Sequence, residues 1–245
     1  MRLIRTGFLA AVLAVSGCAG NSALLNDIGK IAEQALGQPG SALSIEDITG
    51  GLKQALSIGT GNVVSQLGQV DGFNADPVAH IPLPTALVKA RNVASKVGLA
   101  SSFNSLEDRM NQAAEKAVPL AKDLFVGAIQ QMTLDDARGI LQGSDDAATQ
   151  FFRRTTGDQL RNSMRPIIDN SLGQVGAVRA FQQLMSSYHR IPFAPPVEAN
   201  LTEHVLDKGM DGIWHYIAVE ESAIRQNPVK RTTDLLRRVF GSQDL

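Results

Sequence analysis

The sequence predicts an all-α fold, a single bundle-like domain of several helices joined by proline-rich connectors. Three observations carry this prediction. Apolar residues recur every three to four positions along most of the chain, which is typical of helices with one buried face. No run of alternating apolar and polar residues indicates a strand, and β-branched clusters are sparse. The prolines gather mostly in connectors and at helix starts, where they disturb helical hydrogen bonding least.

The first 17 residues have the layout of a secretory signal peptide. Arg2 and Arg5 precede a short apolar run, residues 8–15, which is too brief to span a bilayer. The stretch VSGC (residues 15–18) resembles the lipobox of bacterial lipoproteins, in which the cysteine is acylated and becomes the mature N-terminus. Cys18 is the only cysteine in the sequence, so its acylation leaves no thiol for a disulfide, a metal or catalysis. We therefore expect a cleaved signal peptide and lipidation of Cys18.

This anchor determines the expected location and partners. Two acyl chains hold a protein stably on a membrane, and Ala19 after the cysteine, rather than aspartate, favours the outer membrane by resemblance to lipoproteins of two-membrane bacteria. We expect a lipid-anchored protein of the cell envelope that faces the periplasm. Removal of residues 1–17 takes away two arginines and no acid, so 21 basic and 24 acidic residues remain and the net charge is −3. Without a basic excess, nucleic acid is not an expected partner.

The mature chain divides into a tether and a domain. Residues 18–43 form the lipidated N-terminus and tether, with a short helix at 21–37 that the stretch GQPGS ends, and residues 44–241 form the domain. Ser44 and Asp47 have the spacing of a capping box. Helices are expected at about 44–70, 85–97, 103–132 with an interruption at Pro119, 134–142, 145–162, 164–187, 200–226 and 228–241. The stretch HIPLP (80–84) is expected to be a rigid non-helical connector, because its prolines force an extended path, and RIPFAPP (190–196) is expected to be a second rigid connector.

The sequence lacks the common catalytic signatures, namely a phosphate-binding loop, G-x-S-x-G, H-E-x-x-H and the E-x-x-H pair of helical di-iron sites. No cofactor is expected. The nearest approach to a metal motif is His204, Asp211 and His215, which fall within one sector of a helical wheel. Lys208 shares this sector and an apolar arc lies opposite. We therefore interpret the sector as a solvated polar face, with a metal site as the weaker alternative.

Polar residues also interrupt two otherwise apolar helical faces. Glu107, Asn111 and Glu115 are spaced four apart beside an alanine-rich stripe. Glu220 falls within the apolar arc of the helix 200–226, with Glu221 at its edge. A carboxylate in such a place must be paired, protonated or face a cavity. The simpler interpretation is structural, as buried ion pairs and hydrogen bonds between helices, and the alternative is a ligand pocket.

Several stretches, taken in order, resemble one family of bacterial envelope proteins. They are GLKQAL (51–56), DGF (71–73), IPLP (81–84), MNQAAEKA (110–117), MTLDDARGILQGSDDAAT (132–149), DGIWHYIAVEESAIRQNP (211–228) and TTDLLRRVFG (232–241). Together they resemble the family catalogued as domain of unknown function 4197 (DUF4197), over about residues 44–241. The resemblance implies one domain and carries no activity. The resemblance also implies that six polar residues fall within the recurring motifs of the family, namely Asn111, Glu115, Asp136, Thr149, Glu221 and Arg225. It favours Glu221 as the inward glutamate, whereas the helical wheel favours Glu220.

Two functions therefore remain open on the sequence alone. The first is a non-enzymatic binding or interaction module that holds an envelope protein or a small apolar ligand. Its candidate binding residues, or internal polar network, are Glu107, Asn111, Glu115, Asp136, Thr149, Glu220, Glu221 and Arg225. The second is a hydrolase or metal-dependent enzyme that uses the buried carboxylates. The missing catalytic signatures favour the first.

Overall fold

The computed structural model describes residues 44–241, which belong to one compact unit, Leu43–Leu245. Every regular element within the described range is a helix, which confirms the all-α prediction. The α-helices are α2 (Ile45–Leu67), α3 (Thr85–Ala94), α4 (Ala100–Leu120), α5 (Lys122–Gln130), α6 (Leu134–Leu141), α7 (Ala147–Gln174), α8 (Ala177–Tyr188), α9 (Leu201–Gln226) and α10 (Asp234–Gly241). Two short 3-10 helices are η1 (Ser95–Val97) and η2 (Pro228–Lys230).

Side-chain caps account for where several helices begin. At the start of α2 the N–H of Asp47 donates to the Ser44 hydroxyl, and the N–H of Ser44 donates to the Asp47 carboxylate. Thr133 and Asp136 form the same reciprocal pair at the start of α6, and Asn200 caps α9. Each cap satisfies N–H groups that have no partner within their own helix. The capping box expected at Ser44 is therefore present.

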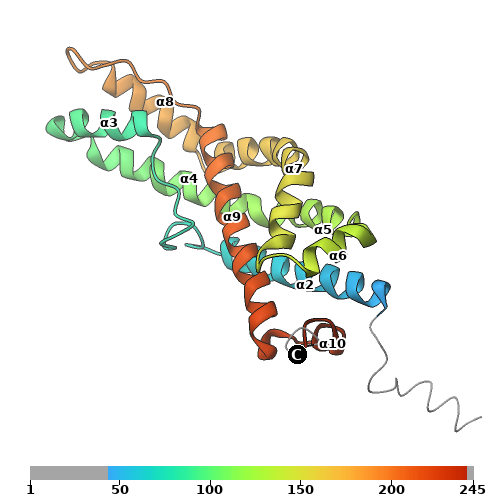
Figure 1. Ribbon diagram of the computed structural model, residues 1–245. Helices are drawn as coiled ribbons and strands as arrows, with labels where there is room; N and C mark the ends of the chain where they lie inside the picture. Colours follow the sequence, from blue (N-terminus) through green and yellow to red (C-terminus); the bar gives the residue numbers. More distant parts are fainter. Residues whose placement is uncertain (1–43, 242–245) are drawn as a thin grey trace, which may run out of the picture. The chain divides into compact units, whose positions relative to one another are not determined.

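The helices pack around one another as Figure 1 shows, and they share one continuous apolar core. Helix α9 packs against α7 and α2, while α4 packs against α7 and α8. Every α-helix of the described range contributes buried side chains to a single cluster. Trp214 of α9 stands edge-on to Phe125 of α5, with ring centroids 5.7 Å apart. Burial of this apolar surface is the main force that holds the helices together.

The chain between α2 and α3 runs without regular structure over residues 68–84, which we call the irregular segment. It includes the extended stretch HIPLP, as the prolines predict, and it buries the side chains of Phe73, Ile81 and Leu83. Buried backbone without helix or sheet bonding must find hydrogen-bond partners elsewhere. The neighbouring helices α4 and α9 supply these partners.

The break expected near residue 163 is wrong. Helix α7 continues to Gln174 with Pro166 inside it, and the chain turns only at Gly176, whose φ is +73°. Pro166 removes one helical hydrogen bond. The helix persists because Met164 and Ile168 lie on one buried stripe on either side of the proline. The interruption expected at Pro119 is present two residues later, between α4 and α5.

The signal peptide, Cys18 and the short helix expected at 21–37 lie outside the described residues. None of the helices within residues 44–241 combines the length and apolar composition that crossing a bilayer requires.

Candidate functional site

The row of polar residues on α4 faces the irregular segment. The N–H groups of Phe73 and Asn74 donate to Oε1 of Glu115, at 3.2 and 3.3 Å. Asn111 makes a double contact with Ile81. Its Oδ1 accepts from the Ile81 N–H at 2.8 Å, and its Nδ2 donates to the Ile81 carbonyl at 2.9 Å. These side chains replace the backbone partners that the irregular segment lacks.

Glu107 extends the row to the end of the irregular segment. Its Oε2 accepts from the N–H of Leu83 at 3.1 Å and lies 3.9 Å from Nη1 of Arg91. Its Oε1 lies 3.1 Å from Nε2 of His80, whose Nδ1 lies 3.0 Å from the carbonyl of Asn74. The imidazole therefore links the irregular segment to α4.

Helix α9 holds the irregular segment through Tyr216. The Tyr216 hydroxyl donates to one oxygen of Asp76 at 2.6 Å, and the other oxygen accepts from the N–H groups of Val78 and Ala79. Burial by itself would raise the pKa of Asp76. The hydrogen bonds from Tyr216, Ala79 and Val78, together with the charge of His215, outweigh burial and lower that pKa below 3.8. The hydrogen bond to Asp76, with burial and the carboxylate charge, raises the pKa of Tyr216 to about 12.

Glu221 of α9 is the buried member of the glutamate pair, with 6% of its surface exposed. It accepts hydrogen bonds from the N–H groups of Ala148 and Thr149 at 3.0 and 2.9 Å, and from the Thr149 hydroxyl at 2.8 Å. Nη2 of Arg225 lies 2.9 Å away. The carboxylate therefore meets the first turn of α7, where the helix dipole favours negative charge. The structure places Glu221 in the core rather than Glu220, the residue that the helical wheel favours.

The other two residues of the predicted network lie apart from these contacts. Glu220 accepts from Nδ2 of Asn62 at 3.0 Å and lies 3.6 Å from Nζ of Lys230, nearer the surface. Asp136 caps α6. The predicted residues thus divide into an α4 group (Glu107, Asn111 and Glu115) and an α7–α9 group (Thr149, Glu221 and Arg225). In both groups the carboxylates hold neighbouring chain segments in place.

The three candidate metal ligands, His204, Asp211 and His215, do not point toward a common site. Nε2 of His204 lies 2.7 Å from the carbonyl of Pro82, and Asp211 accepts a hydrogen bond from Arg153 at 3.2 Å. The His215 ring stands edge-on to the ring of Tyr216, with centroids 5.1 Å apart. Across residues 44–241, no three His, Cys, Asp or Glu side chains are grouped so that they could hold a metal ion.

The polar stripe of α9 pairs with a basic stripe on α7. Acids recur every four residues on α9, and arginines occupy positions separated by multiples of four on α7. The ion pairs join Arg165 to Glu203, Arg161 to Glu203 and Asp207, and Arg153 to Asp211. We call this set the ion-pair ladder. The face that the sequence predicts to be solvated is therefore partly a contact between two helices.

The ion-pair ladder lacks one rung, at Gly157. This residue lies midway between Arg153 and Arg161 on the same stripe of α7, and it has no side chain to reach α9. A groove of about 490 Å³ opens there, within the usual range for ligand sites of about 300–1,000 Å³. Its lining includes three cations and three acids, namely Arg153, Arg161, Lys208, Asp158, Asp207 and Asp211. The nearly buried Met210 and Trp214 also line it.

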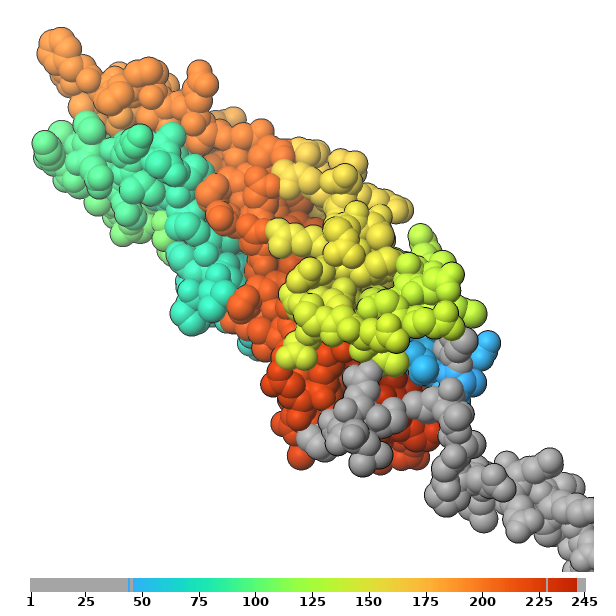
Figure 2. Space-filling model, viewed as in Figure 1, coloured from blue at the N-terminus to red at the C-terminus, as the bar shows by residue number. Residues whose placement is uncertain are grey.

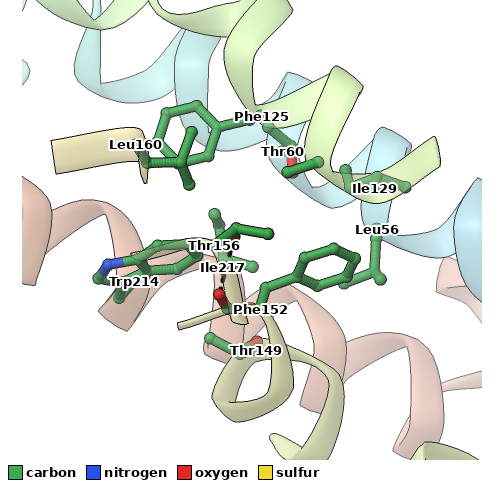
Figure 3. Close-up of a pocket in the computed structure, with 11 residues that line it drawn as sticks. Leu56, Thr60, Phe125, Ile129, Thr149, Phe152, Thr156, Leu160, Trp214 and Ile217 are labelled. Carbon is green, nitrogen blue, oxygen red and sulfur yellow. Dashed lines mark hydrogen bonds between the residues drawn. The ribbon is translucent and has the colours of Figure 1, made fainter. Parts of the chain in front are cut away.

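Two apolar cavities beneath this surface are far smaller. One, of about 10 Å³, lies between α2, α5, α7 and α9, and its lining includes Phe125, Trp214 and Ile217 (Figure 3). In the same view the Thr156 hydroxyl donates to the carbonyl of Phe152, at 2.8 Å. The second, beside Glu221, is also about 10 Å³. Each has room for about one water molecule, so neither is preformed for the small apolar ligand that the sequence suggested.

Sequence reasoning missed the groove at Gly157. A signal for it existed, because positions 153, 157, 161 and 165 share one face of a helix and glycine is the uncharged member. The acids at 203, 207 and 211 have the same spacing. The antiparallel register that brings the two stripes together is a tertiary feature, and the spacing alone does not specify it.

The comparisons with known proteins return one family. The model of a family described as "Protein of unknown function (DUF4197)" matches residues 42–241. No curated protein and no solved structure matches the chain. The matched range includes the ion-pair ladder, the groove and both groups of buried polar residues.

Proposed function

Because this chain belongs to the DUF4197 family, a family described only as proteins of unknown function, we propose a function from its own site. We propose that it is a lipid-anchored binding module of the bacterial cell envelope. The groove at Gly157 carries this proposal, since a volume of about 490 Å³ opens between α7 and α9 where the ion-pair ladder has no side chain at position 157.

The lining of the groove indicates the chemistry of the partner. Three cations and three acids balance one another, so the groove does not select a polyanion or a polycation. Asp207 and Asp211 are already paired with arginines of the ion-pair ladder. Nζ of Lys208 also lies 3.9 Å from Asp211. A polar chain segment that carries both charges, such as an exposed loop of an envelope protein, matches this lining.

Binding is favoured over catalysis because of how the buried carboxylates are used. Glu115 and Glu221 accept hydrogen bonds from backbone N–H groups, and Glu221 is also paired with Arg225. Both oxygens of Glu221 and Oε1 of Glu115 are therefore already occupied, and a carboxylate held in this way is poorly placed to exchange protons with a substrate. Their role is to position the irregular segment and the first turn of α7.

The anchor is proposed from the sequence. Support comes from the position of the single cysteine, directly after a small-residue site and a short apolar run that follows two arginines. Acylation of Cys18 would hold the module on the membrane, facing the periplasm. The residue after the cysteine, Ala19, favours the outer membrane.

The groove is tested by filling it. A photoreactive phenylalanine analogue replaces Lys208 in the native host, and cross-linked products are compared in two backgrounds, Gly157→Gln and Gly173→Gln. Both glycines lie on α7, and a Cβ added at either meets no atom within 4 Å, so both variants are expected to fold. Only Gly157 lines the groove. We expect a discrete adduct that is lost in Gly157→Gln and kept in Gly173→Gln. An absent adduct, or one equally strong in both backgrounds, would contradict the groove as the binding site.

The anchor is tested separately by labelling growing cells with an alkyne fatty acid. We expect the wild-type protein to take up the label and to sediment with membranes, and Cys18→Ala to do neither. An unlabelled wild-type protein would refute lipidation and leave the groove unaffected.

A further inference from the structure

Two stretches of the chain at one end of the described unit contain basic residues and no acidic ones. The sequence contains no Asp or Glu over residues 85–106 or over 170–197, although the whole chain has 24. These two ranges cover α3, η1 and the start of α4, and α8 with the connector after it. They lie together at one end of the unit, and α2 begins at the other end (Figure 1). We call this the basic end.

The cations of the basic end are largely free to meet an external charge. They are Lys89, Lys96, Arg179 and Arg190, which are exposed, and Arg91, which is partly buried. Within residues 44–241 only Arg91 has an acidic neighbour, Glu107, at 3.9 Å. This arrangement differs from α7, where arginines of the ladder are matched with acids of α9.

A fully exposed phenylalanine projects from the same end. Phe193 lies in the connector after α8, which protrudes beyond the neighbouring helices (Figure 2), and its relative exposure is 105%. The Ala194 N–H donates to the Ile191 carbonyl at 3.2 Å and closes a turn in which Pro192 is the second residue and Phe193 the third. The φ of Phe193 is +61°. The third position of such a turn normally carries glycine, and a bulky residue there is strained.

This strained position argues for a role outside the fold. Phe193 buries no surface within the described unit, and glycine would adopt its backbone conformation without strain. Val97, at the tip of η1, is also 57% exposed beside Lys96. The basic end therefore combines unpaired cations with apolar side chains that point to solvent.

We propose that the basic end binds the surface of a lipid bilayer that contains anionic phospholipids, with Phe193 inserted among the headgroups. Cations near such a surface are attracted by its negative potential, and an exposed aromatic ring gains by leaving water at the boundary of the acyl chains. This is a second membrane contact, separate from the proposed anchor on Cys18 and from the groove at Gly157.

The test uses residues 19–245, which lack the acylation site but keep the entire described unit. Co-sedimentation is measured with vesicles of phosphatidylcholine alone and of phosphatidylcholine mixed equally with phosphatidylglycerol. We expect binding to the mixed vesicles only, and weaker binding as salt is added, because salt screens exposed charges. Equal binding to both vesicles, or binding to neither, would overturn the proposal.

Two variants assign the contact to the basic end. Phe193→Gly is expected to fold at least as stably as wild type, because it relieves the positive φ, and to bind the mixed vesicles about tenfold more weakly. Its control, Val229→Ser, changes another exposed apolar residue, in η2, and is expected to bind normally. The pair Lys96→Gln with Arg190→Gln is expected to weaken binding roughly 25-fold, since each cation near an anionic surface contributes about a factor of five.

The control for charge is Lys116→Gln with Lys122→Gln, which removes the same charge from exposed positions outside the basic end. We expect this variant to keep most of the binding. Normal binding by Phe193→Gly, or equal losses in the two charge variants, would show that the basic end is not the membrane contact.

Discussion

Glu220 and Glu221 are adjacent in the sequence and differ in what surrounds them. The Glu221 side chain is 5% exposed and its partner Arg225 is 7% exposed, whereas the side chain of Glu220 is 18% exposed and its cationic neighbour, Lys230, is 47% exposed. Removing one member of a buried ion pair leaves the other charge without compensation. Near the surface, water replaces the missing partner.

We therefore expect Glu221→Ala to lower the free energy of unfolding by about 3–5 kcal/mol. We expect Glu220→Ala to lower it by about 1 kcal/mol or less. Urea denaturation followed by circular dichroism measures both. Similar losses in the two variants would show that burial does not distinguish these glutamates.

The pair Asp76 and Tyr216 predicts how stability responds to pH. The folded protein lowers the pKa of Asp76 below 3.8. The ionised carboxylate therefore stabilises the fold above that pH, and this stabilisation disappears as the pH falls through the folded pKa. The folded protein raises the pKa of Tyr216 from 10.0 to about 12. The protonated hydroxyl therefore stabilises the fold below pH 10, and this stabilisation disappears as the pH rises toward about 12. Urea unfolding of wild type and Tyr216→Phe is expected to differ most near neutral pH, and less at both extremes.

Tyr188→Phe is the control for this measurement between neutral and acidic pH. The Tyr188 hydroxyl is buried and has no hydrogen-bond partner within the described residues. Its removal should leave stability unchanged or raise it, without the acid dependence of Tyr216→Phe. A constant difference between wild type and Tyr216→Phe across the whole pH range would contradict a role for the Asp76 contact.

At the scale of elements, two glycines of α2 have opposite surroundings. A Cβ on Gly51 would lie 2.7 Å from Cγ2 of Val239 in α10, whereas a Cβ on Gly61 would meet no atom within 4 Å. Valine is stiff at χ1 and cannot swing away. The absence of a side chain at Gly51 is what allows α10 to close onto α2.

We expect Gly51→Ala to destabilise the protein by about 1–3 kcal/mol through overpacking. Gly61→Ala, on the same helix, should stabilise it by about 0.5–1 kcal/mol, because alanine loses less backbone entropy than glycine. Thermal unfolding followed by circular dichroism compares them. A gain in both variants would mean that α10 moves freely away from α2.

The element scale also shows where sequence reasoning succeeds. Helix starts at Ser44 and Thr133 were predictable because capping is local, made by residues three apart. The continuation of α7 through Pro166 was not predictable from the sequence. Burial of Met164 and Ile168 against other helices outweighs the local tendency of proline to end a helix. Local preferences fail where packing with distant residues is stronger.

At the scale of the whole molecule, the single apolar cluster predicts that the described unit unfolds as one body. Every α-helix from α2 to α10 contributes to it. The only tryptophan, Trp214, is buried and touches both an apolar cavity and the groove. Its fluorescence therefore reports tertiary packing, while circular dichroism reports helix content.

We expect the two signals to follow the same transition in urea, with one midpoint. If the Trp214 fluorescence changed at a lower urea concentration than the helical signal, α9 would separate from α7 before the helices melt. That result would contradict a single cooperative core.

The sequence by itself determined the helical class, several helix starts, the two proline-rich connectors and the choice of polar residues on α4 and α9, because periodicity, capping and proline geometry act over a few residues. Only the tertiary structure decided which glutamate is buried, why His204, Asp211 and His215 do not meet, and that the α9 stripe pairs with α7. It also decided that Gly157 opens a groove and that the two acid-free ranges share one end. These features depend on the register and orientation of helices far apart in the chain, which the packing of the whole core selects.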